Sequence, residues 1–166
     1  MTADLIQRIA AFVVLVVVQA LVLNHIHLFG VATPFFYVYF VLLFRRNHPK
    51  WIILLTSFLL GLCIDVFSNT PGLAAASTTL IAVLQPYILE PFIPRDSDEN
   101  LKPGMHTLGI GRFIYYTVFM VFLYNLVFFS LEAFNFFNWL QWLLCIGGST
   151  LLTVVLILVV ENLRRS

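Results

Sequence analysis

Long apolar stretches, separated by short polar segments, are the feature that most limits how this chain can fold. A bilayer core about 30 Å thick is crossed by roughly 20 apolar residues in a helix. Backbone groups inside lipid have no water to bind, so each crossing segment is expected to be helical. We therefore predict a single all-α membrane domain over residues 1–166, built as a six-transmembrane-helix bundle. Its helices are expected at about residues 5–23, 29–44, 51–67, 72–90, 111–131 and 138–160.

Composition agrees with a lipid-embedded chain and excludes a soluble globular domain. Hydrophobic residues make up 61% of the chain and charged residues 10%, whereas soluble domains have roughly 45–50% and 25%. The net charge of +1 is not gathered into a basic patch, so nucleic acid is not expected as a partner. The two cysteines, Cys63 and Cys145, lie in separate apolar stretches and are interpreted as small buried hydrophobes. The first stretch lacks a small-residue cleavage site and is expected to be retained as a helix.

The positions of Lys and Arg predict how the helices thread the membrane. Basic residues in short loops gather on the cytoplasmic side, and here they occur in alternate loops. Six crossings with both termini in the cytoplasm place every basic residue on that side, and removal of one helix does not. These residues are Arg8, Arg45, Arg46, Lys50, Arg95, Lys102, Arg112, Arg164 and Arg165.

Two of the six predicted helices have weaker signals than the others. Residues 29–44 follow the first helix closely, and residues 72–90 contain Pro86, with Pro91 just beyond. Proline removes a backbone hydrogen bond and kinks or ends a helix, so the segment around Pro86 is a candidate to bend along the membrane surface. A protein with four or five crossings, which lacks one or both of these helices, is the alternative.

One acid, Asp65, lies inside an apolar stretch, where an ionisable group is costly unless it has partners. It belongs to a face of small and polar residues that includes Ser57, Gly61 and Ser68 at helical spacing. The following segment has a small-residue face of its own, and small residues let helices approach closely in lipid. We therefore predict that the two helices form a tight antiparallel hairpin, with Pro71 at the first position of the second helix. The second face consists of Gly72, Ala75, Ala76, Thr79 and Ala82.

The sequence leaves two interpretations of Asp65 open. In the first, its carboxylate accepts hydrogen bonds from the free amides at the start of the next helix, where an anion is favourable. In the second, Asp65 belongs to a polar cluster near the outer leaflet with Gln19, Asn125 and Gln141. Such a cluster would line a cavity or meet a helix of a partner.

The remaining polar residues do not assemble into a reaction site or a metal site in the sequence. His25 and His27 have a spacing at which two imidazoles can share a zinc ion, but no further ligand lies near them. Glu90, Glu132 and Glu161 are expected at helix ends that water reaches. We expect no metal, no cofactor and no catalytic residue.

The chain resembles the MreD family of bacterial rod shape-determining proteins at four positions of this hairpin, which are Gly61, Asp65, Pro71 and Gly72. Members of that family share a Gly-rich, Asp-bearing end of one membrane helix, followed by a Pro/Gly turn and a helix of small residues. The length, the six apolar segments and the predicted cytoplasmic termini also match, and the specific likeness is confined to this hairpin. The family is similar in fold to the membrane substrate-binding subunits of energy-coupling-factor vitamin transporters.

The resemblance implies a non-enzymatic scaffold of the cell-elongation machinery, which helps to position and regulate peptidoglycan synthesis and so maintains cell shape. It implies a multi-pass protein of the bacterial cytoplasmic (inner) membrane. The implied partners are an MreC-like bitopic protein, a RodA-like glycosyltransferase with its transpeptidase partner, and MreB filaments, contacted directly or indirectly. Asn125 and the four hairpin residues are the candidates for structural or partner contacts.

Two other classes of protein are weighed against this resemblance. A vitamin-binding subunit of an energy-coupling-factor transporter typically carries an Ala-x-x-x-Ala pattern on its first helix, which docks its transport partner. That pattern is absent here, because Ala10 is followed four positions later by Val14, and Ala11 by Leu15. A small membrane enzyme would need several intramembrane acids, or a nucleophile with a base, and Asp65 lies largely alone in this sequence.

Overall fold

The computed structural model describes residues 2–26, 30, 32–134 and 138–165 and is all-helical. In that part of the chain, five helices are long and apolar enough to cross a membrane, as in a multi-pass membrane protein. The long helices are α1 (Thr2–Leu21), α3 (Lys50–Ser68), α4 (Leu73–Leu89), α6 (Ile110–Glu132) and α7 (Trp139–Arg165). The short helical segments are η1 (Leu23–His25), α2 (Val38–Leu42), η2 (Glu90–Phe92) and α5 (Met105–Leu108).

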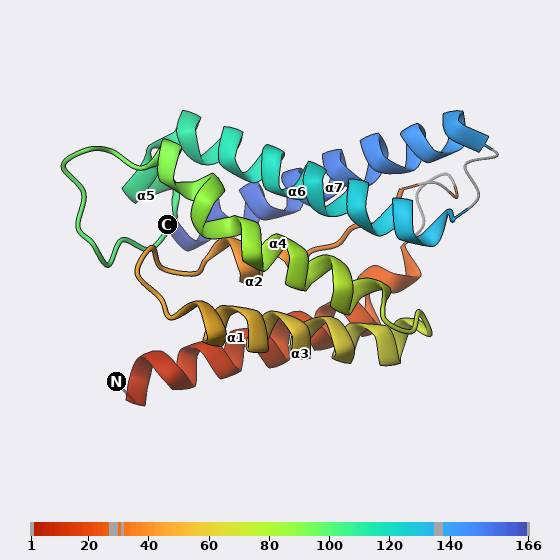
Figure 1. Cartoon of the computed structure of the whole chain (residues 1–166), viewed down its shortest axis with the longest axis horizontal. Coiled ribbons are helices and arrows are strands. Elements are labelled where there is room, and N and C mark those ends of the chain that lie inside the picture. The colour runs from red at the N-terminus through yellow and green to blue at the C-terminus, as the bar shows by residue number, and fades with distance from the viewer. Residues whose placement is uncertain (1, 27–29, 31, 135–137, 166) are drawn as a thin grey trace.

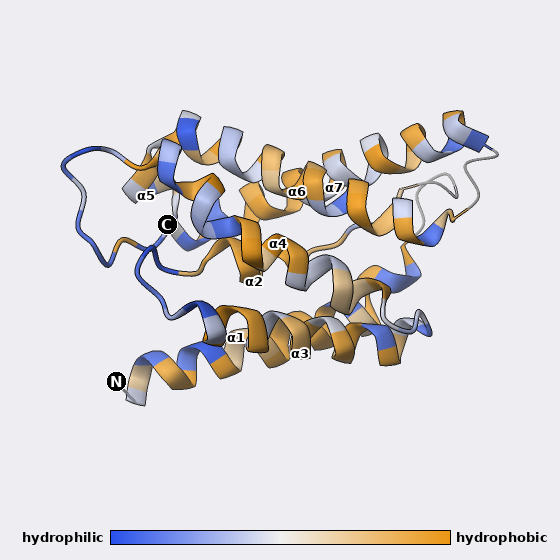
Figure 2. Ribbon diagram, in the orientation of Figure 1, coloured by the Kyte–Doolittle hydropathy of each residue, from blue (hydrophilic) through white to orange (hydrophobic). Residues whose placement is uncertain are grey.

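The long helices lie lengthwise beside one another. α1 and α3 form one side of the bundle and α6 with α7 the other, with α2 and α4 between them (Figure 1). Both ends of the chain and the loop at residues 93–104 lie at one end of the molecule, here named the termini end (Figure 1). The turn between α3 and α4 lies at the opposite end, named the hairpin end. Apolar residues predominate along the helices and hydrophilic residues gather near the two ends, as a bilayer requires (Figure 2).

The prediction of a helix over residues 29–44 is wrong. Of its described residues only those of α2 are α-helical, and residues 33–35 are neither helix nor strand. Pro34 accounts for part of this difference, because proline has no N–H and disfavours helical backbone at the residue before it. The bundle therefore has five long helices in the described chain, where the sequence predicted six.

Side chains of α7 bind the backbone groups that a helix would have satisfied internally. The Thr33 N–H donates to Ser149 Oγ at 3.1 Å, and the Phe35 N–H donates to Thr153 Oγ1 at 3.0 Å. Non-helical backbone is tolerated at membrane depth only where protein surrounds it. Ala32, Phe35 and Tyr37, which precede α2, meet this condition, since each is 9% exposed or less.

The second segment with a weak signal, residues 72–90, is a helix. α4 continues through Pro86 to Leu89, and η2 extends it to Phe92. The alternative that lacks a helix here is therefore wrong. Other predicted boundaries lie close to the observed ones, except that α7 continues to Arg165, beyond the predicted end at residue 160.

The core between residues 37–44, α4 and α6 contains buried tyrosines whose hydroxyl groups have protein partners. The hydroxyls of Tyr37 and Tyr124 contact each other. Tyr116 donates to the Leu42 carbonyl oxygen at 3.3 Å and accepts from Gln85 Nε2 at 3.2 Å. These bonds replace water in a region where an unsatisfied polar group would be costly.

Candidate functional site

The candidate site lies at the hairpin end, where α3 turns into α4. α3 ends at Ser68, and Asn69 follows it in the left-handed region with φ 55°. Gly72 precedes α4 with φ 83°, a conformation that glycine adopts without steric penalty. α4 begins at Leu73, so Pro71 lies within the turn. The prediction that Pro71 occupies the first helical position is therefore wrong.

Asp65 binds the amides that open α4. Its Oδ1 accepts from the Ala74 N–H at 2.8 Å, and its Oδ2 accepts from the Ala75 N–H at 2.9 Å. The Thr70 hydroxyl donates to Oδ1 at 2.9 Å. The N-terminal amides of a helix commonly bind the side chain of the N-cap residue, which here is Gly72 and has none. Asp65 supplies the missing acceptor from the preceding helix, as the first interpretation of this residue described.

Gly61 sets how closely α3 and α4 approach. A Cβ atom at Gly61 would lie 2.4 Å from Ala75 Cα and 2.5 Å from Thr78 Oγ1, so any side chain there would collide with α4. Thr78 also donates to the Ser57 carbonyl oxygen at 3.0 Å, which joins the helices one turn further along. The tight antiparallel hairpin predicted from the small-residue faces is confirmed.

The polar cluster considered for Asp65 is not assembled. Asn125 is fully buried on α6 and donates to Thr150 Oγ1 of α7 at 2.9 Å. Gln141 is exposed on α7. Four of the five candidate residues therefore lie together at the hairpin, and Asn125 joins two other helices.

Gln19 connects α1 to the irregular segment and, through Asn24, to the hairpin end. Its Oε1 accepts from the Phe36 N–H at 3.1 Å, and its Nε2 donates to the Pro34 carbonyl oxygen at 2.9 Å and to Asn24 Oδ1 at 3.0 Å. Asn24 Nδ2 then donates to Ser68 Oγ at 2.7 Å. Gln19 thus reaches the last residue of α3 through one intermediate side chain.

A cavity of about 330 Å³ opens at the hairpin end between η1, residues 33–37 and the ends of α3 and α6. Its polar wall includes Asn24, His25, Ser68, Thr70 and Glu132. Polar residues at this end of the bundle therefore do border a cavity, although they are not the set that the sequence suggested.

His27, the second member of the His-x-His pair, lies outside the described residues. Among the residues that the structure does describe, no three His, Cys, Asp or Glu side chains gather where they could hold a metal ion. Glu90 and Glu132 are exposed, in agreement with their predicted place at helix ends.

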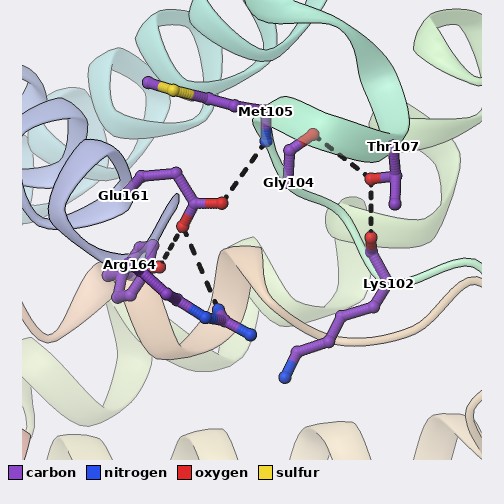
Figure 3. A network of polar contacts seen from close by, with 7 residues as sticks. Lys102, Gly104, Met105, Thr107, Glu161 and Arg164 are labelled. Atoms are coloured by element: carbon purple, nitrogen blue, oxygen red, sulfur yellow. Dashed lines mark hydrogen bonds and ion pairs between the residues drawn. The ribbon is translucent and has the colours of Figure 1, made fainter. Parts of the chain in front are cut away.

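Glu161 is a buried acid, and the expectation that water reaches it is wrong. It is 6% exposed, because α7 continues past it and the segment around α5 covers it. The Tyr39 hydroxyl donates to its Oε2. The Met105 N–H donates to its Oε1 at 3.3 Å, and Arg164 Nη1 lies 4.0 Å from Oε2 (Figure 3). No local pattern could have shown this network, since Tyr39 and Glu161 are 122 residues apart.

Comparison with known proteins adds no relative to this picture. No protein-family model matches the chain, and neither a curated protein nor a solved structure matches it. The residues of the hairpin and their geometry therefore carry the functional argument.

Proposed function

We propose that this chain is a non-enzymatic scaffold of the cell-elongation machinery in the bacterial cytoplasmic membrane. Its role would be to help position and regulate peptidoglycan synthesis and so maintain cell shape. Its partners would be an MreC-like bitopic protein and a RodA-like glycosyltransferase with its transpeptidase, with MreB filaments contacted directly or indirectly. Both termini would lie in the cytoplasm.

The observation that carries this proposal is that the four residues of the MreD resemblance form one structural unit. Gly61 permits the close approach of α3 and α4, and Asp65 binds the amides that this approach brings to it. Pro71 and Gly72 lie in the turn that directs α4 toward Asp65. Residues that depend on one another in space support a shared motif better than four positions scattered over a fold.

The bonding of the two buried acids supports a scaffold over a catalyst. Asp65 uses both carboxylate oxygens on backbone amides of α4, and Glu161 uses one on the first amide of α5. A general acid or base must instead reach a proton of the substrate. These acids hold helices in place, which is what a rigid membrane platform needs.

α7 presents an apolar face that suits contact with a membrane partner. Leu144, Leu151, Val155 and Val159 are each at least 50% exposed and recur at helical spacing. A face of this kind packs against lipid or against the transmembrane helix of a bitopic protein. It is where we place the first search for partner contacts.

Capture of partners from native membranes tests the proposal. We expect crosslinking of the tagged chain, followed by mass spectrometry, to enrich an MreC-like protein and a RodA-like glycosyltransferase. Asp65→Ala should weaken that capture, whereas Asp98→Ala in the exposed loop at residues 93–104 removes an acid without touching the hairpin. Enrichment of membrane proteins unrelated to cell elongation, with none of these partners, would contradict the proposal.

One observation favours a second candidate function, the binding of a small molecule such as a vitamin. The cavity of about 330 Å³ at the hairpin end falls within the range of roughly 300–1,000 Å³ that is usual for small-molecule sites. Native mass spectrometry of the purified protein would detect a ligand that stays bound. Ser68→Phe places a large side chain in this cavity. A ligand mass that stays on the wild-type protein and is absent from Ser68→Phe would favour small-molecule binding over the scaffold.

A further inference from the structure

A groove runs along the termini end of the bundle, between the first half of α1, residues 40–48 and the first half of α3, and has a volume of about 470 Å³. It exists because α1 packs through its second half. The buried residues of α1 are Leu15, Val16 and Gln19, whereas Leu5 is 61% exposed. The apolar wall of the groove consists of Leu5, Ile9, Phe12, Phe40, Phe44, Ile52 and Leu59.

Basic side chains border this groove. The Arg8 guanidinium contacts the His48 imidazole, and both line the groove. Arg8 also lines a smaller adjoining cavity of about 70 Å³, together with Arg45 and Lys102. Asp4 is the one carboxylate that lines either cavity in the described part of the chain, and its Oδ2 lies 3.3 Å from Arg45 Nη2. Three cations therefore share one anion.

Lys102 is held beside the other cations by the fold of its loop. The Thr107 hydroxyl donates to the Lys102 carbonyl oxygen at 2.8 Å, which fixes the backbone there (Figure 3). Partial burial and the positive charges of Arg164, Arg45 and Arg8 lower the pKa of Lys102. Burial is the largest cause of this lowered pKa, and the nearby positive charges act in the same direction.

We infer that this groove binds an anionic phospholipid, with its phosphate on Arg8, Arg45 and Lys102 and an acyl chain along the apolar wall. Guanidinium groups bind phosphate oxygens through paired N–H donors. Basic clusters beside membrane helices attract anionic lipid headgroups. A bound phosphate would offset the repulsion among the three cations.

The shape and the charge of the groove together favour this occupant over others. A zwitterionic phospholipid would cover the apolar wall but would leave the excess positive charge uncompensated. An acidic peptide segment would offset the charge but would leave the exposed apolar side chains of Leu5, Ile9 and Leu59 in the groove uncovered. An anionic phospholipid satisfies both requirements at once.

Native mass spectrometry of the full chain, with added phosphatidylglycerol or phosphatidylcholine, tests the inference. We expect the wild-type protein to retain phosphatidylglycerol in preference. Arg8→Gln combined with Arg45→Gln should lower that affinity about thirtyfold. Arg95→Gln combined with Arg112→Gln removes the same charge at exposed positions of the same end, outside the groove, and should leave the affinity unchanged. Equal losses in both pairs, or equal retention of the two lipids, would overturn the inference.

A second variant tests the apolar wall without altering any charge. Leu59 is 46% exposed, so Leu59→Trp fills the groove while the core of the bundle stays intact. Its retention of phosphatidylglycerol should fall, with thermal unfolding unchanged from wild type. Wild-type retention by Leu59→Trp would overturn the placement of the acyl chain. A photo-crosslinking residue at position 9 that captures a protein instead of a lipid in native membranes would overturn the identity of the occupant.

Discussion

The two ends of the bundle are each held by a buried acid, over very different sequence distances. At the hairpin end, Asp65 accepts the amides that open α4, nine and ten residues further along the chain. At the termini end, Glu161 accepts the Met105 N–H that opens α5, 56 residues earlier, and the Tyr39 hydroxyl, 122 residues earlier. Both carboxylates satisfy amides at helix N-termini, where a negative charge is favourable.

The same kind of contact, a buried carboxylate that accepts an amide N–H at a helix N-terminus, joins residues close in sequence at the hairpin end and residues far apart in sequence at the termini end. The Asp65 network lies within a single hairpin, so it needs only α3 and α4 to form. The Glu161 network needs α7, α5 and residues near α2 to be in place together. We therefore expect the hairpin end to depend on Asp65 more sharply than the termini end depends on Glu161, because His106 and Thr107, directly after Met105, are exposed to water.

Asp65→Ala should have the largest effect on stability. It leaves the Ala74 and Ala75 amides without an acceptor inside the bundle, which should lower the free energy of unfolding by about 4 kcal/mol. Unfolding of the purified protein in detergent measures this loss. Asp98→Ala, in the exposed loop, should change the same quantity by less than about 0.5 kcal/mol. Equal free energies of unfolding for the two variants would contradict the claim that Asp65 stabilises the hairpin end.

Gly61→Val should have the next largest effect. The new side chain would overlap the backbone of Ala75, and overpacking of this kind costs about 3 kcal/mol. Gly147→Ala is the matched control, because a Cβ at Gly147 meets no atom within 4 Å. Comparable unfolding midpoints for both variants would show that α3 and α4 can separate without loss.

Glu161→Ala should lower the free energy of unfolding by about 2 kcal/mol, since it removes the acceptor of the Met105 N–H and the Tyr39 hydroxyl. Glu132→Ala removes an exposed acid and should be nearly neutral in the same unfolding measurement. The comparison between the two ends would break if Glu161→Ala were as damaging as Asp65→Ala.

The smallest expected effect is a pH dependence at the termini end. Burial and the charges of Arg8 and Arg45 lower the pKa of His48. In the unfolded chain the pKa of a histidine is about 6.5. As the pH falls below that value the unfolded state takes up the proton first, so the folded state loses stability on acidification.

His48→Gln should therefore reduce the fall in thermal stability between about pH 7 and 5. His106→Gln, at an exposed position of the same end, should keep the wild-type pH profile. A profile of His48→Gln that matches wild type over this range would assign the pH dependence to another group.

The sequence by itself determined that the chain has membrane-spanning segments, where its five long helices lie, and that α3 and α4 form a tight antiparallel hairpin. Apolar length and helical spacing are local properties, and a helix forms its hydrogen bonds within itself. The spacing of Gly61 and Asp65 from the following turn is local as well. For that reason the residue pattern alone could place four of the five candidate residues together.

Only the tertiary structure decided the path of residues 32–44, the burial of Glu161 and the basic groove beside α1. Thr33 and Phe35 donate to Ser149 and Thr153, which lie 116 and 118 residues further along the chain. Apolar content alone predicted a helix there, because it cannot show that distant side chains will satisfy the backbone instead. Contacts between residues so far apart in sequence form only when whole helices pack together, and a local sequence pattern cannot predict them.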